Sequence, residues 1–403
     1  GDFGDTPNDG QFVMNGIVFA DLEPKPQYFE TKKVYQHIGV KAIDEKQGRF
    51  EIFNKYYFKD LSEYEIRWAL YENGKEAENG VLNTENIAPR TRLQVTIPYR
   101  YNNLKANAEY FVKVQFVLRN NMPWAEKGYV MAEEQLPVKT ATGIAPINEV
   151  TDGNGNAICP GYVLTPLVEG MAKQSDPRFS TIKGENFEAK FDNETGTIYS
   201  LNYGGETIIA DGNGPKLDAM RAFTNNDNWF YANWFECGLH NLKHQVTASK
   251  VINRKDGAIV LFYTVESQAP NGAKILGGTS SGKNSIKELT EKPFGEDDFK
   301  FTTNQIWTVY PDGSIELQAS VTSNQPDLVL PRLGYVMKVP QRYENYTYYG
   351  RGPIGNYPDR KVGQFIEIHK STVADQFVNF PKPQDMGNHE DVRWCALTNQ
   401  AGN

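Results

Sequence analysis

Phe111-Val112-Lys113-Val114-Gln115-Phe116-Val117 alternates apolar with polar side chains through most of its length. A period of two places successive side chains on opposite faces of an extended chain, so this stretch predicts a half-buried β-strand. Arg49-Phe50-Glu51-Ile52-Phe53-Asn54 and Glu65-Ile66-Arg67-Trp68-Ala69-Leu70 alternate in the same way, and Glu72-Asn73-Gly74-Lys75 supplies an Asn-Gly hairpin turn. Short strands with no helical periodicity between them predict an antiparallel β-sandwich of about a hundred residues.

A second β-rich region follows a break in this pattern. Residues 143–180 are interrupted by Gly, Pro and Asn, as in Asp152-Gly153-Asn154-Gly155-Asn156, and are interpreted as a linker. Beyond them, Phe187-Glu188-Ala189-Lys190-Phe191 and Ile198-Tyr199-Ser200-Leu201 flank the turn Asn193-Glu194-Thr195-Gly196. Residues 181–403 are therefore also predicted to be all-β, and they are too many for a second sandwich of the same size.

The length and charge of the chain exclude some classes of protein. It has 403 residues, which predicts two or three domains. Its net charge of -8 argues against nucleic-acid binding, because such proteins neutralise phosphates with clustered Lys and Arg. No apolar run approaches the ~18 residues of a membrane-spanning helix. We therefore expect neither a nucleic-acid partner nor a membrane partner.

Cysteine and histidine do not predict a metal site. Cys159, Cys237 and Cys395 lie far apart, without the spacing of a disulfide framework or a metal knuckle. His240 and His244 are four residues apart, but the sequence around them is not that of a zinc-binding helix.

The first residues carry a longer motif. Gly1-Asp2-Phe3-Gly4-Asp5-Thr6-Pro7-Asn8-Asp9, followed by Gln11-Phe12-Val13-Met14-Asn15-Gly16-Ile17-Val18-Phe19-Ala20-Asp21, resembles a signature of glycoside hydrolase family 2 β-galactosidases. In that family the segment closes the catalytic (β/α)₈ barrel. The resemblance implies a barrel remnant at 1–26, an immunoglobulin-like β-sandwich at 27–142, a linker at 143–180, and a galactose-mutarotase-like β-supersandwich at 181–403.

Further segments resemble four other motifs of the same family. Three residues depart from the family pattern: Phe223 stands where the family usually has Pro, Asn225 where it has Asp, and Gly355 where it has Glu. The matching segments are Trp124-Ala125-Glu126-Lys127-Gly128-Tyr129 with Glu133-Glu134-Gln135, Met220-Arg221-Ala222 with Asn226-Asp227, Leu330-Pro331-Arg332-Leu333-Gly334, and Gly350-Arg351-Gly352-Pro353-Ile354-Gly355-Asn356-Tyr357-Pro358-Asp359-Arg360.

The resemblance implies that the chain is the C-terminal part of a retaining β-galactosidase. Retaining hydrolysis needs two carboxyl groups about 5–5.5 Å apart. In the family both lie upstream of Gly1, so we expect no catalytic residue here and no hydrolysis by this chain alone. The chain lacks an initiator Met and is expected to stop before the supersandwich is complete. Its expected partners are a β-galactoside, the remainder of the parent chain and further copies in a homo-oligomer, in either the bacterial cytoplasm or the periplasm.

The resemblance also implies site residues. The backbone carbonyl of Phe12 and the side-chain oxygen of Asn15 are expected to bind a Na⁺ that contacts the galactosyl group, and Asn8 is expected near a Mg²⁺. Oxygen ligands suit both ions. Trp229 lies in a loop expected to fold over the active site and stack on sugar, although a core role for Trp229 and Trp234 stays open. The acidic residues Asp2, Asp5 and Asp9 are interpreted as turn formers.

Two other functions remain open at this point. The chain could be a carbohydrate-binding module or the small subunit of a split galactosidase. The chain could also be a sugar epimerase that uses His389 with Glu390, although the sequence shows no second histidine placed to support that function.

Overall fold

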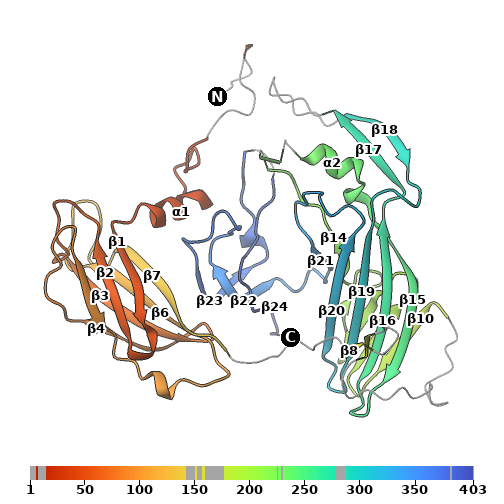
Figure 1. Ribbon diagram of the computed structural model, residues 1–403, viewed down its shortest axis with the longest axis horizontal. Helices are drawn as coiled ribbons and strands as arrows, with labels where there is room; N and C mark the ends of the chain where they lie inside the picture. Colours follow the sequence, from red (N-terminus) through yellow and green to blue (C-terminus); the bar gives the residue numbers. More distant parts are fainter. Residues whose placement is uncertain are drawn as a thin grey trace. The chain divides into compact units, whose positions relative to one another are not determined.

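The computed structural model describes residues 6–7, 15–141, 150–151, 157–158, 177–224, 226–227, 230–276, 287–381 and 384–402, and consists mostly of β-strands and loops (Figure 1). The all-β class predicted from the sequence is confirmed. The chain divides into two compact units: unit 1 comprises Gly1–Val13, Pro146–Tyr343 and Lys382–Asp385, and unit 2 comprises Met14–Ala145, Glu344–Pro381 and Met386–Asn403. No helix in the described ranges is long and apolar enough to cross a membrane.

Unit 2 contains the first β-sandwich. One sheet has the strand order β1-β2-β5 and the other β4-β3-β6-β7. The strands are β1 (Ile38–Asp44), β2 (Arg49–Asn54), β3 (Tyr64–Glu72), β4 (Lys75–Leu82), β5 (Arg92–Thr96), β6 (Tyr110–Leu118) and β7 (Val130–Lys139). The alternation read from the sequence points Phe50 and Ile52 of one sheet, and Val112, Val114 and Phe116 of the other, into a single apolar core.

The Asn-Gly hairpin forms where the sequence predicts it. Glu72 pairs with Lys75, and Asn73 and Gly74 both have positive φ, 47° and 77°, as a two-residue hairpin of this type requires. A β-carbon on Gly74 would lie 2.6 Å from the ring of Tyr349. Glycine is therefore needed both for the turn and for the close approach of a distant strand.

That distant strand belongs to a C-terminal sheet of order β23-β22-β24, built from β22 (Asn345–Gly352), β23 (Phe365–Thr372) and β24 (Trp394–Thr398). Phe111 of the sandwich packs with Tyr349 and Ile366 of this sheet in one buried apolar cluster. Polar contacts reinforce it: Lys113 Nζ lies 2.8 Å from Glu367 Oε1. The domain boundaries predicted from the sequence, which assign these strands to residues 181–403, stay predictions. The sequence does not predict that this sheet groups with the first sandwich.

Helix α1 (Pro26–Val34) leads into the sandwich (Figure 1). Pro26 at its first turn fits the fixed φ of proline, and Lys32 and Lys33 lie in its last turn, near the negative end of the helix dipole. Lys33 Nζ lies 2.7 Å from Glu134 Oε2 of β7, and the amide of Gly363 donates to Glu30 Oε2 at 2.8 Å. The helix is therefore tied to the sandwich and to the loop between β22 and β23.

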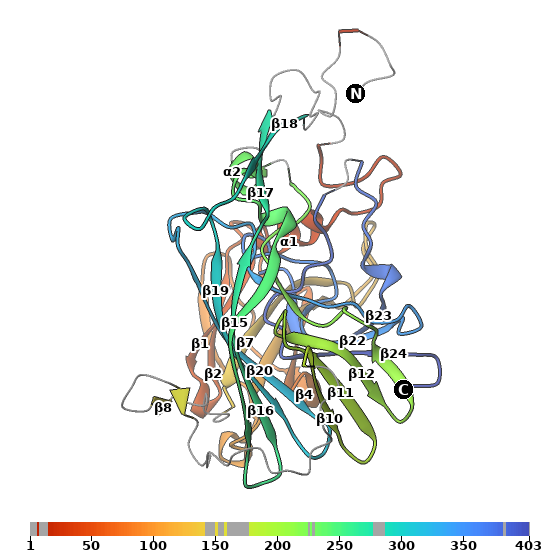
Figure 2. The same ribbon diagram turned by 90° about the vertical axis from the view of Figure 1, so that its right-hand side faces the viewer.

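Unit 1 is a second sandwich. Its sheets have the orders β10-β11-β12-β13 and β15-β16-β19-β20, and Figure 2 shows β10, β11 and β12 side by side. Phe191 of the first sheet packs edge-on to Trp307 of the second, with ring centroids 5.5 Å apart, inside a shared apolar core. The strands are β10 (Phe179–Lys183), β11 (Phe187–Asp192), β12 (Thr197–Tyr203), β13 (Glu206–Ile209), β15 (Lys243–Asn253), β16 (Ile259–Gln268), β19 (Phe301–Val309) and β20 (Ile315–Ser323).

Short elements extend unit 1 beyond its two sheets. Helix α2 (Tyr231–Glu236) contributes Tyr231 and Trp234 to a second apolar core. The remaining strands pair two by two: β8 (Val150–Thr151) with β9 (Ala157–Ile158), β14 (Lys216–Asp218) with β21 (Gly334–Val336), and β17 (Asn271–Leu276) with β18 (Lys287–Pro293).

Candidate functional site

Of the site residues predicted from the sequence, only Asn15 lies within the described residues. Its side chain is exposed, and it precedes a tight reversal of the chain in which the Lys25 amide donates to the Ile17 carbonyl at 3.0 Å. Lys25 is itself buried and donates through Nζ to the carbonyl of Gly16 at 2.8 Å. Asn8, Phe12 and Trp229 lie outside the described residues.

The described residues do not by themselves assemble a metal site. Within them, no group of three or more His, Cys, Asp or Glu side chains could hold a metal ion. Asn15 offers one amide oxygen of the kind that Na⁺ or Mg²⁺ accepts, and a single neutral donor does not make a binding site for either ion. The sequence-predicted Na⁺ and Mg²⁺ sites therefore stay predictions, and no reaction step is derived through either ion.

The motif around Arg221 forms a turn in unit 1 that is held by hydrogen bonds to one carboxylate. Arg221 Nη2 donates to Asp227 Oδ1 at 2.8 Å, and the amide of Thr224 donates to Asp227 Oδ2 at 2.7 Å. Asp227 is 6% exposed, so the second contact satisfies the other oxygen of a buried carboxylate. These two contacts hold Asp227 at the start of the segment that the family resemblance predicts to be a lid.

Phe223, which departs from the family pattern, has a packing role. Its ring centroid lies 5.2 Å from that of Tyr231, 6.2 Å from Trp234 and 5.7 Å from Phe235. Trp234 is 2% exposed and donates through Nε1 to the carbonyl of Val329 at 2.7 Å. Trp234 is therefore a core residue, which resolves the alternative left open for it.

The motif at Leu330–Gly334 contributes Arg332 to an ion pair with Asp218 in unit 1. Arg332 donates through Nε to Asp218 Oδ2 at 2.8 Å, and its Nη2 contacts the same oxygen. Asp218 lies on β14, which pairs with β21 in the register Asp218 to Gly334. The motif thus joins the two strands of this short sheet by a side-chain contact as well as by backbone pairing.

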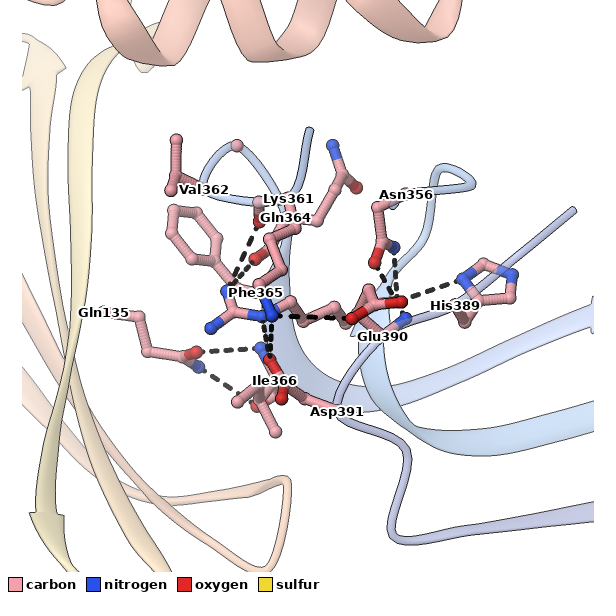
Figure 3. Close-up of polar contacts among 12 residues, drawn as sticks. Gln135, Asn356, Lys361, Val362, Gln364, Phe365, Ile366, His389, Glu390 and Asp391 are labelled. Carbon is pink, nitrogen blue, oxygen red and sulfur yellow. Dashed lines mark hydrogen bonds and ion pairs between the residues drawn. The ribbon is translucent and has the colours of Figure 1, made fainter. Parts of the chain in front are cut away.

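The motif at Gly350–Arg360 forms a hydrogen-bonded loop in unit 2, and Figure 3 shows part of it. Asn356 is fully buried, and its Nδ2 donates to the carbonyls of Arg351 and Ile354, both at 3.0 Å. Its Oδ1 accepts from the amide of Glu390 at 2.8 Å (Figure 3). Its amide donates to the carbonyl of Asn388 at 2.7 Å. One side chain therefore joins two segments that are more than thirty residues apart in sequence.

Gly355 stands beside this junction. A β-carbon there would lie 3.5 Å from the amide nitrogen of Gly387 and 3.6 Å from the carbonyl oxygen of Asn388, which are ordinary van der Waals distances. The backbone therefore does not require glycine at this position, although the 387–388 segment covers it closely.

Arg351 connects the loop to the C-terminal sheet. Its Nη1 donates to the carbonyl of Gln364 at 2.8 Å, and its Nε bonds Asp391. The hydrogen bond from Arg351 lowers the pKa of Asp391 below its ordinary value, against the raising effect of burial. Lys361 Nζ lies 3.7 Å from the same carboxylate, so Asp391 is shared between two cations.

His389 is held by the fold on both ring nitrogens. Nδ1 lies 3.0 Å from the carbonyl oxygen of Arg351, and Nε2 lies 2.7 Å from Gln376 Oε1. The rings of His389 and His369 lie 4.3 Å and 5.2 Å from that of Tyr348, and burial lowers the pKa of both histidines. A second histidine thus lies near His389, but the bonds of His389 are internal, so it acts as a structural group and the epimerase reading gains no support.

Sequence reasoning did not identify Asn356, Arg351 and Asp391 as a structural unit. Asn356 lies in a Gly-rich and Pro-rich run of sequence, and such a run is equally typical of an exposed turn. His240 and His244, four residues apart, do not share a helix. The ring of His240 lies 4.6 Å from that of Phe235 in a tilted arrangement, and His244 lies on β15 with Nδ1 2.9 Å from Ser267 Oγ.

Comparison with known proteins gives three matches in chain order. Residues 1–40 match the glycosyl hydrolases family 2 TIM barrel domain, residues 50–139 match β-galactosidase domain 4, and residues 183–402 match the β-galactosidase small chain. The last match covers more than half of the 403 residues.

Relatives align over nearly the whole chain. Proteins named β-galactosidase from Priestia megaterium and Halalkalibacterium halodurans are 29% and 26% identical over 100% of this chain, and one from Streptococcus thermophilus is 27% identical over 98% of it. The aligned residues make up 34%, 35% and 33% of these relatives, so the chain spans about a third of their length. The chain belongs to the β-galactosidase small-chain family and corresponds to the C-terminal portion of glycosyl hydrolase family 2 β-galactosidases.

Proposed function

We propose that this chain works as the C-terminal part of a retaining β-galactosidase, which hydrolyses terminal non-reducing β-D-galactose residues of β-galactosides. The observation that carries the proposal is the succession of three family matches, barrel end, domain 4 and small chain, along one polypeptide. In this proposal the chain supports the barrel, and the two catalytic carboxyl groups belong to the barrel.

The test compares this chain with a longer polypeptide that joins it to a β-galactosidase barrel. We expect the longer polypeptide to release nitrophenol from a nitrophenyl β-galactoside and the 403-residue chain to release none. A matched control is the longer polypeptide in which each of the two catalytic carboxyl residues of the barrel is changed to its amide. Turnover by the 403-residue chain itself would contradict the proposal.

We further propose that Asn8, Phe12 and Asn15 form a rim near bound Mg²⁺ and Na⁺ in the complete enzyme, with Phe12 and Asn15 near the galactosyl group. When bound, these cations would supply positive charge beside substrate oxygens. The exposure of Asn15 supports the proposal, because its side chain is available to a ligand. The test is Asn15→Ala in the longer polypeptide, with Asn15→Asp as the matched variant; an unchanged dependence of KM on Na⁺ concentration in both would contradict it.

Trp229 is proposed as the sugar-stacking residue of a lid over the active site. Support comes from both neighbours: Asp227 is fixed by Arg221, and Tyr231 begins helix α2. The indole ring of tryptophan offers an apolar face on which a sugar ring can stack. We expect Trp229→Ala to raise KM for galactosides more than Trp229→Phe does; equal effects would contradict a stacking role.

A second candidate is favoured by the description of the largest match, β-galactosidase small chain. In this alternative the chain is the small subunit of a split enzyme, and activity appears when it is mixed with a separately made barrel chain. Activity on mixing would support the split arrangement, whereas activity only in the joined polypeptide would support the single-chain one. We also propose that the complete enzyme is a homo-oligomer, which sedimentation of the longer polypeptide tests.

A further inference from the structure

The first sandwich exposes five large aromatic side chains among its described residues. They are Phe58 at 99%, Tyr35 at 74%, Tyr57 at 69%, Trp124 at 56% and Tyr129 at 40% exposure. Soluble monomers rarely expose clustered aromatic surface, and Tyr, Trp and Phe are enriched at the centres of protein interfaces. We call these five residues the aromatic rim.

The strand pairing places the whole rim at one end of the sandwich. Tyr35 precedes β1, Tyr57 and Phe58 lie between β2 and β3, and Trp124 and Tyr129 lie between β6 and β7. Ile38 of β1 pairs with Asn54 of β2, and Tyr64 of β3 pairs with Leu118 of β6, so these three connections leave the sheets at the same end.

Residues flanking Tyr35 and Tyr57 join those two parts of the rim, and Trp124 contacts Tyr129 within the third. The Lys55 amide donates to the carbonyl of His37 at 2.8 Å, and the ring of His37 stacks on that of Tyr56 at 4.8 Å. Trp124 and Tyr129 meet edge to face at 6.0 Å.

The loop that carries Tyr57 and Phe58 is held firmly although their side chains face solvent. Asn54 is fully buried, and its Nδ2 donates to the carbonyls of Lys59 and Ile87 at 2.9 and 3.0 Å. The Arg90 amide donates to the carbonyl of Tyr56 at 3.1 Å, and its guanidinium lies 4.7 Å from the ring centroid of Tyr57. A loop fixed in this way loses little conformational entropy when its exposed rings are covered.

Helix α1, which leads into this end of the sandwich, belongs to the segment that matches the barrel domain. The helix lies inside residues 1–40, which match the TIM barrel domain, and so does Tyr35. Lys32 Nζ of α1 lies 4.7 Å from the ring centroid of Tyr129, so the barrel-matching segment already contacts the rim. The relatives carry about two thirds of their length outside the part aligned with this chain.

We propose that the aromatic rim is the surface on which the glycosyl hydrolase barrel docks. The partner is an apolar face on the outside of that barrel, adjacent to where the segment containing α1 leaves it. The inference rests on the proposed function, because it takes the barrel to be the physiological neighbour of this chain. Phe58 makes the sharpest prediction, since a side chain exposed at 99% contributes almost nothing to the fold of the free sandwich.

The test measures one substitution in two settings. Phe58→Asp is placed in the 403-residue chain and in the longer polypeptide that carries the barrel. We expect the melting temperature of the 403-residue chain alone to stay unchanged. In the longer polypeptide, we expect the half-life of the folded state at raised temperature to fall at least about tenfold. Ile43→Asp is the matched control, since Ile43 is an exposed apolar residue near the C-terminal end of strand β1, away from the rim. It should act equally in both settings.

Each outcome bears on the inference. An equal effect of Phe58→Asp in the two settings overturns it, even when the longer polypeptide hydrolyses galactosides and the proposed function holds. A selective effect supports docking even when the longer polypeptide fails to hydrolyse galactosides, in which case the proposed function alone fails. Self-association of the 403-residue chain, or its binding of galacto-oligosaccharides, also overturns the inference if Phe58→Asp abolishes it, because the rim would then serve a second copy or a sugar.

Discussion

The aromatic cluster around Trp234 in unit 1 and the loop around Asn356 in unit 2 both surround motifs of the same family, but different forces hold them. Phe223, Tyr231, Trp234 and Phe235 pack ring against ring. The side chain of Asn356 instead joins its loop to neighbouring segments through hydrogen bonds to backbone carbonyls and an amide. Apolar packing tolerates conservative exchange, whereas no other side chain of the same length keeps both the donor and the acceptor of a buried Asn.

The largest expected effect tests the apolar side of this comparison. Trp234→Ala should lower the free energy of unfolding by about 3–5 kcal/mol, because it leaves a cavity and unpairs the carbonyl of Val329. Urea unfolding followed by circular dichroism measures it. Trp234→Phe, which keeps most of the ring, should cost clearly less; equal losses would show that the hydrogen bond and not the packing dominates.

Asn356→Ala tests the polar side. It should lower the free energy of unfolding by about 2–4 kcal/mol, since two carbonyls and one amide lose their buried partner. The specific readout is amide hydrogen exchange at Glu390, which should speed up. Asn356→Asp is the control that keeps the acceptor oxygen and loses the donor, so it should spare the Glu390 amide; fast exchange in both variants would assign the effect to general loosening.

The pH dependence tests how well unit 1 excludes water. Burial lowers the pKa of His244 from 6.5 to about 4. Between pH 8 and pH 5 the unfolded chain takes up a proton at this residue and the folded chain does not, so stability should fall with decreasing pH, by up to about 2 kcal/mol. The difference between wild type and His244→Gln in pH-dependent urea unfolding isolates the effect; parallel curves would contradict it.

The smallest effect concerns the contact between the sandwich and the C-terminal sheet. A double-mutant cycle on Lys113 and Glu367, with Met and Gln as replacements, should give a coupling of about 1 kcal/mol, because both side chains are mostly buried and 2.8 Å apart. The control pair, Lys41 with Glu51, has a lysine that is 60% exposed and should couple more weakly. A stronger coupling in the control pair would contradict the ranking by burial.

Local patterns predicted the local structure. The alternation in Phe111–Val117 became β6, and Asn73-Gly74 became the tight turn between β3 and β4, because period and turn chemistry are properties of adjacent residues. The assignment of Trp234 stayed open, since an aromatic residue in a motif carries no mark of its burial.

Non-local organisation could not be predicted in the same way. Lys113 and Glu367 are 254 positions apart, and nothing in either neighbourhood signals the other. The Gly-rich and Pro-rich run around Asn356 would also suit an exposed turn, and the burial of Asn356 depends on the distant segment 388–390. The resemblance to a family supplied the order of the parts but not which strands would pack together.

The grouping of β22, β23 and β24 with the first sandwich has a consequence during protein synthesis. Tyr349 donates through its hydroxyl to Glu109 Oε2 at 2.6 Å across 240 positions of sequence, beside the apolar contact of Phe111 with Ile366. At about 5–20 residues per second, a ribosome needs roughly 10–50 s to make the intervening chain. For that time the Phe111 face of the nascent sandwich has no cover from the C-terminal sheet, and apolar surface exposed in this way is prone to aggregation.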